Sequence, residues 1–101
     1  MKNSEKVFLA TTGRGLARAK SDGNGVWLVT SLLQGYDVRA LAADPLNARV
    51  IYAGTQGEGV LRSEDRGQTW APAGMPKQIV KSLAASPHDR GVVYAGTKPA
   101  S

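Results

Sequence analysis

The chain of 101 residues contains no cysteine, a single histidine and only six aromatic side chains. Without cysteine it forms no disulfide and no thiolate metal site, and His88 has no partners nearby in the sequence for metal binding or for a catalytic triad. No apolar run approaches the roughly 20 residues of a membrane-spanning helix, and Val7 to Ala10 is too short for a signal peptide. We therefore expect a cytoplasmic protein with no metal, no cofactor and no membrane association.

The formal net charge of +5 raises the question of nucleic-acid binding. The lysines and arginines are spread along the chain, with one loose cluster at Arg14, Arg18 and Lys20. Neither a nucleic-acid-binding motif nor a basic stripe with interleaved aromatic residues accompanies them. This pattern is typical of a solvated basic surface, and we expect no nucleic-acid partner.

Internal repetition is the most informative feature of the sequence. VFLATTGRG at 7–15 aligns with IYAGTQGEG at 51–59, an offset of 44 residues. DVRALAADP at 37–45 aligns with IVKSLAASP at 79–87, and VIYAGT at 50–55 with VVYAGT at 92–97, each with an offset of 42 residues. Three segments that share nearly one period indicate structural repeats, and periods of about 40 to 50 residues are typical of propeller blades.

Turn residues divide each period into short strands, and no segment has helical spacing. We therefore predict an all-β fold of antiparallel four-stranded β-propeller blades, forming a partial propeller of about two blades within residues 1–101. Residues 38–72 would form one complete blade. Residues 7–30 would supply the last three strands of the preceding blade, and residues 80–97 the first two strands of the next.

The stretch SEDRGQTW at 63–70 falls between the two outermost strands of the complete blade. The Asp65 side chain can accept hydrogen bonds from backbone amides that follow it in a turn. Gly67 can adopt a left-handed conformation, and Thr69 and Trp70 would open the outermost strand. The pattern therefore indicates a structural turn rather than an active site.

Five of these residues resemble a known family motif. Ser63, Asp65, Gly67, Thr69 and Trp70 match S-x-D-x-G-x-T-W, the Asp-box of bacterial neuraminidase repeats. The likeness extends over residues 7–97, and the family includes sialidases, xyloglucanases and sortilin ectodomains. It implies a β-propeller whose Asp-boxes lie at the blade periphery, away from the ligand face.

An earlier copy of the motif, KSDGNGVW at 20–27, keeps Asp22 and Trp27 at the spacing of Asp65 and Trp70. Because Asp22 and Asp65 would serve equivalent turns in successive blades, we do not interpret them as a catalytic pair. No catalytic motif of sialidases or xyloglucanases maps onto the chain. We expect a non-enzymatic interaction scaffold or ligand-binding propeller segment; the alternative is an N-terminal fragment of a propeller glycoside hydrolase whose catalytic residues lie in missing blades.

Strand polarity places two kinds of connection opposite the Asp-boxes, those from the second to the third strand of a blade and those from its fourth strand to the next blade, and we predict the ligand face there. The candidate residues on this face are Arg14, Tyr36, Asp37, Arg39, Glu58, Lys77 and Lys81. Two basic residues at equivalent strand starts, Arg39 and Lys81, suit a polar or anionic ligand. Too few repeats are present to close a ring, so we expect missing C-terminal blades in the natural protein and self-association of the isolated chain.

Overall fold

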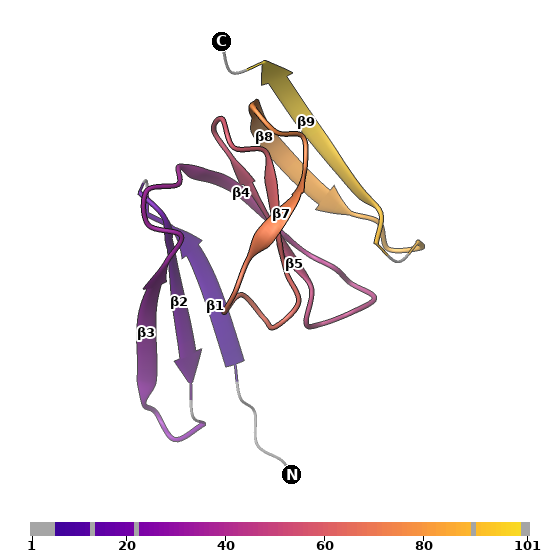
Figure 1. Ribbon diagram of the computed structural model, residues 1–101. Helices are drawn as coiled ribbons and strands as arrows, with labels where there is room; N and C mark the ends of the chain where they lie inside the picture. Colours follow the sequence, from indigo (N-terminus) through magenta and orange to yellow (C-terminus); the bar gives the residue numbers. More distant parts are fainter. Residues whose placement is uncertain (1–5, 13, 22, 90, 100–101) are drawn as a thin grey trace.

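The computed structural model describes residues 6–12, 14–21, 23–89 and 91–99. Within these ranges the chain has nine strands and no helix, and the strands form three separate antiparallel sheets. The prediction of an all-β, antiparallel fold is therefore confirmed. The sheets follow one another in chain order, so the first lies at one side of the molecule and the third at the other (Figure 1).

The first sheet has the order β1-β2-β3, and the second has the order β4-β5-β6-β7. Their strands are β1 (Lys6–Thr11), β2 (Leu16–Ser21), β3 (Trp27–Leu32), β4 (Val38–Ala43), β5 (Ile51–Thr55), β6 (Val60–Ser63) and β7 (Ala71–Gly74). The third sheet pairs β8 (Gln78–Ala85) with β9 (Val93–Pro99). The last strand of the second sheet begins at Ala71, so Thr69 and Trp70 belong to the preceding loop and not to the strand as expected.

The β5–β6 turn shows why glycine recurs in these hairpins. Gly59 has a φ of 76°, and a Cβ atom there would collide with the carbonyl oxygen of Met75. The fully buried Thr55 closes the same turn, since its Oγ1 donates to the Gly59 carbonyl at 2.8 Å and accepts from the Glu58 amide at 2.9 Å. Only glycine satisfies both the backbone conformation and the close approach of β7.

The second sheet has a hydrophobic cluster on each face, because successive side chains of a strand point to opposite sides. One cluster contains Val50, Tyr52, Val60 and Val80, with Leu83, Val93 and Ala95 packed against it. It joins the second sheet to the third. The other contains Val38, Ala53 and Leu61, with Leu33, Tyr36, Leu41 and Trp70 packed against it. Its outer members include the β3–β4 connection, which comes from the first sheet.

The β1–β2 hairpin is paired one residue differently from the β5–β6 hairpin. The repeat alignment matches Thr11 with Thr55 and Leu16 with Val60. Thr11 lies directly opposite Leu16, whereas Val60 lies opposite Gly54. A change of one residue in register exchanges the two faces of a strand. The side chains of β1 therefore point to the opposite sides from those that the alignment predicts.

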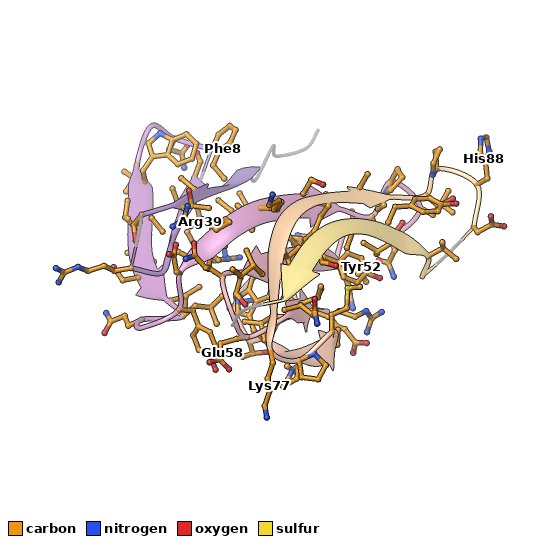
Figure 2. The ribbon with its side chains drawn as sticks, turned by 90° about the horizontal axis from the view of Figure 1, so that it is seen from above. Phe8, Arg39, Tyr52, Glu58, Lys77 and His88 are labelled. Carbon is orange, nitrogen blue, oxygen red and sulfur yellow. The ribbon has the colours of Figure 1, made fainter. Side chains whose placement is uncertain are left out.

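Leu9 and Phe8 show the consequence of this register. Leu9 faces the second sheet, where its methyl groups lie 3.2 Å from the position that a Cβ atom on Gly67 would take. Its counterpart Ala53 instead faces the cluster that includes the β3–β4 connection. Phe8 points away from the second sheet and is 59% exposed, although its counterpart Tyr52 is buried (Figure 2).

Candidate functional site

The 63–70 loop is organised around the carboxylate of Asp65. Oδ1 accepts hydrogen bonds from the backbone amides of Gln68 and Thr69 at 3.0 and 2.8 Å and from the Ser63 hydroxyl at 2.8 Å. Oδ2 accepts from the Thr69 hydroxyl at 2.5 Å. The Ser63 Oγ in turn accepts from the Gly67 amide at 2.8 Å. The carboxylate thus takes the place that backbone carbonyls would take in a regular turn.

These hydrogen bonds also determine the acidity of Asp65. The Thr69 hydroxyl and amide, with further help from Ser63 and Gln68, lower the pKa of Asp65 to about 2. A carboxylate with so low a pKa and such complete hydrogen bonding is a poor general acid or base near neutral pH. A cavity of about 250 Å³ adjoins the loop and includes Arg49 and Glu64 in its lining, but Asp65 is committed to the turn.

The remaining residues of the loop tie it to its surroundings. The Trp70 indole Nε1 donates to the Gly67 carbonyl at 2.9 Å, and the ring packs against the cluster of Val38, Ala53 and Leu61. Gly67 is buried with a φ of 89°. From the first sheet, the buried guanidinium of Arg18 donates from Nε to the Arg66 carbonyl at 2.9 Å. The loop therefore connects two sheets.

The earlier copy of the motif differs in structure from the 63–70 loop. Asp22 lies outside the described residues. Ser21 is buried at the end of β2, and its Oγ accepts a hydrogen bond from the Gly23 amide at 3.1 Å, as the Ser63 Oγ does from the Asp65 amide at 3.3 Å. Ser21, rather than Lys20, is thus the local counterpart of Ser63. Trp27 opens β3 on the outer side of the first sheet, where its ring centroid is 5.4 Å from that of Phe8.

The connections of the chain lie at two opposite ends of the molecule. Figure 1 shows the β1–β2 and β5–β6 turns and the β3–β4 and β7–β8 connections at one end, and the 63–70 loop at the other. The first end, which we call the candidate ligand end, carries the seven candidate residues. They do not form one cluster there, and the structure separates them into three groups.

Arg39 and Lys81 form the first group. Both line a cavity of about 370 Å³ together with Gln56, Ile79 and Val80. Arg39 comes from β4 and Lys81 from β8, two neighbouring strands of different sheets. A bridge between Gln56 and Ile79 holds the β5–β6 turn beside β8. Positions that are equivalent in the repeat therefore contribute two cations to one cavity.

Asp37 neutralises part of this charge. Arg39 Nε and Nη2 donate to the two carboxylate oxygens of Asp37 at 2.8 and 2.9 Å, a bidentate arrangement in which both side chains are partly exposed. The hydrogen bonds lower the pKa of Asp37 and raise that of Arg39. Any anion that binds Arg39 through the same donors must displace this carboxylate.

Arg14, Tyr36 and Asp37 form the second group, in a cavity of about 540 Å³ between the β1–β2 turn and the β3–β4 connection. Tyr36 is also packed against the cluster of Val38, Ala53 and Leu61, which gives it a structural role. The Arg14 side chain is exposed. The cavity holds one cation beside one carboxylate, and Asp37 already pairs with Arg39.

Glu58 and Lys77 form the third group. Figure 2 shows them together at one margin of the molecule, apart from Arg39. Backbone hydrogen bonds from Gly57 and Gly59 to the Gln78 carbonyl hold the β5–β6 turn against the start of β8, next to Lys77, which explains their proximity. Both side chains are exposed and line neither cavity. At the candidate ligand end these two residues therefore lie apart from Arg39.

Two residues of the site were missed by sequence reasoning. Gln56 lines the cavity of Arg39 and Lys81. The sequence feature that could have indicated it is the polar residue that recurs after the threonine of each hairpin. Arg18, which we assigned to a solvated surface, is only 8% exposed and bonds the 63–70 loop. Its alternation with the alanines of LARAKS was the only hint that it faces inward.

The chain matches no family model and no curated protein. Within the ranges that the structure describes, no group of three or more His, Asp or Glu side chains is placed to hold a metal ion. Over the same residues, no helix has the length and hydrophobicity required to cross a membrane. His88 lies at the tip of the β8–β9 loop, far from the other labelled residues (Figure 2).

Proposed function

We propose that this chain is a segment of an Asp-box β-propeller that acts as a non-enzymatic scaffold and binds a polar or anionic ligand at the candidate ligand end. The propeller assignment is supported by the repeat period, by the succession of antiparallel sheets in chain order and by the Asp65-centred loop at the opposite end. A scaffold role agrees with the low pKa and full hydrogen bonding of Asp65, which suit a structural turn.

The observation that carries the ligand proposal is the shared cavity of Arg39 and Lys81. Two cations from equivalent positions of neighbouring sheets raise the local potential for an anion more than scattered surface charges do. The polar side chain of Gln56 supplies a neutral hydrogen-bonding group beside them. A small carboxylate or phosphate ligand therefore fits the chemistry of this cavity.

Amide NMR titration tests the proposal, with inorganic phosphate, citrate and a short polyglutamate peptide as probes. We expect shift changes centred on Arg39, Gln56 and Lys81. Lys81→Glu should weaken binding at least several-fold, whereas Lys77→Glu, which makes the same change of net charge on the outer margin, should have a much smaller effect. Equal losses in the two variants, or no shifts with any probe, would contradict a specific site.

Asp37→Asn provides a second test with the opposite sign. The carboxylate competes with any anion for the Arg39 guanidinium, and asparagine keeps the size of the side chain while it removes the charge. We expect the variant to bind phosphate and citrate more tightly than the wild type. Unchanged or weaker binding would show that Arg39 takes no part in ligand recognition.

A further inference from the structure

The outer face of the first sheet carries several exposed apolar side chains. Cross-strand pairs place Phe8 beside Ala19 and Val29, and Trp27 beside Ser21, on the side that points away from the second sheet. Phe8, Trp27 and Val29 are 59%, 45% and 64% exposed. Phe8 and Trp27 contact each other, so the patch, which we call the Phe8 face, has two large rings at its centre.

The opposite end of the row of sheets also has an uncovered face. Tyr94 of β9 is 62% exposed, while its neighbours Val93 and Ala95 pack inward against the second sheet. Gly96 lies two residues beyond Tyr94 and shares its side of the strand. Val92, just before the strand, is also exposed. We call this surface the Tyr94 face.

The junction between the second and third sheets shows what covers such a face. The segment VIYAGT of β5 returns as VVYAGT in β9, so Tyr52 and Gly54 are the counterparts of Tyr94 and Gly96. Tyr52 is only 4% exposed and packs in one cluster with Val80. A Cβ atom on Gly54 would collide with the Val80 side chain, so glycine leaves the hollow into which Val80 fits.

The Tyr94 face repeats the tyrosine and the glycine of this arrangement but has no sheet over it. Its glycine, Gly96, is exposed, and the Ser82 Oγ atom of the neighbouring strand lies 2.7 Å from the position that a Cβ atom on Gly96 would take. The Phe8 face offers what the arrangement lacks, which is a sheet surface with bulky apolar side chains projecting from it. Within one chain these two faces lie on the outer sides of the first and third sheets, so they cannot meet unless two molecules associate (Figure 1).

We propose that the Phe8 face of one molecule binds the Tyr94 face of a second copy of this chain. The contact is head to tail, because two different surfaces meet and each molecule of a pair keeps its other face free. It continues between molecules the sheet-on-sheet packing that joins β5 to β8 within the chain. The inference concerns assembly and does not depend on the anion site at Arg39 and Lys81.

Variants that block one face each provide the test. Phe8→Asp and Tyr94→Asp place a charge at the centre of the respective face, and both original side chains are exposed, so the fold should be retained as judged by circular dichroism. Met75→Asp, at an exposed methionine on the candidate ligand end, is the matched control. Light scattering during size exclusion, in physiological salt to screen the net charge, gives the mass of each species.

We expect the wild type and Met75→Asp to increase in mass with concentration, and each face variant alone to remain monomeric. An equimolar mixture of Phe8→Asp and Tyr94→Asp should form dimers of twice the monomer mass and no larger species, since each molecule retains one intact face. A monomeric wild type at submillimolar concentration would overturn the proposal. Association of the wild type that the mixture does not restore would also overturn it, because the mixture contains an intact copy of each face. Association of either face variant alone would overturn it as well, because the contact would then join two like faces.

Hydrogen exchange on the wild type gives a measurement that needs no variant. Dilution from submillimolar to micromolar concentration should increase exchange in β3 and β9, which carry parts of the two faces, and leave β5 and β6 unchanged. Equal changes in all strands would indicate general unfolding on dilution and would count against a contact between these faces.

Discussion

The Asp65→Ala substitution tests the structural role of the 63–70 loop most directly. It removes the acceptor of two backbone amides, those of Gln68 and Thr69, and of the hydroxyls of Ser63 and Thr69. Gln68 and Thr69 are exposed, so water can replace the lost acceptor at a cost of about 0.5 to 1 kcal/mol for each amide. Ser63 is only 1% exposed, and an unpaired hydroxyl there costs about 1 to 3 kcal/mol.

These contributions share one carboxylate and are not additive, so we expect the free energy of unfolding to fall by about 2 to 4 kcal/mol. For a chain of this size the corresponding decrease in Tm is roughly 10 to 20 °C. Urea denaturation and calorimetry measure both quantities. All proteins must be compared at one concentration, because self-association would shift Tm by mass action.

Two further variants complete the experiment. Asp65→Asn keeps an acceptor for the two amides but loses the charge, so its stability should lie between those of the wild type and Asp65→Ala. Glu64→Ala alters the neighbouring exposed side chain, which pairs with Arg62 at the surface, and should change stability by no more than about 0.5 kcal/mol. If Asp65→Ala kept the stability of the wild type but abolished ligand binding, the loop would be a binding site and the reasoning would be refuted.

Three other predictions follow from the same contacts. Because the folded-state pKa of Asp65 is lowered to about 2, the free energy of unfolding of the wild type should decrease by about 1 to 2 kcal/mol as the pH falls from about 4 to about 2. The decrease should be smaller for Asp65→Asn, and urea denaturation across this range measures both. Gly59→Ala should destabilise the fold more than Gly57→Ala, since both residues have positive φ but only a Cβ atom on Gly59 would collide with another backbone segment. Thermal unfolding of the two variants therefore distinguishes backbone strain alone from strain combined with a steric clash. Arg18→Met should lower the free energy of unfolding, measured by urea denaturation, by about 1 to 3 kcal/mol, because it leaves the Arg66 carbonyl without this donor. If the variant were as stable as the wild type, solvent or another group would have replaced the arginine as donor.

The strands and their turns follow from local chemistry, which is why the sequence predicts an all-β, antiparallel fold. The turn at Asp65 needs only residues within the same eight-residue stretch, because a carboxylate, a buried hydroxyl and a glycine with positive φ complete it locally. The repeat of VIYAGT and VVYAGT likewise identifies β5 and β9 as strands without any knowledge of their neighbours. Short-range hydrogen bonding and alternation determine this level of structure.

Which side of β1 faces the protein was decided only by the tertiary structure. The sequences of the two hairpins align without a gap, yet Thr11 pairs with Leu16 while the corresponding Val60 pairs with Gly54. This difference of one residue directs Leu9 to the second sheet and leaves Phe8 exposed. The cause is that register depends on which face a distant sheet covers, and neighbours in space such as Leu9 and Gly67 are far apart in the sequence.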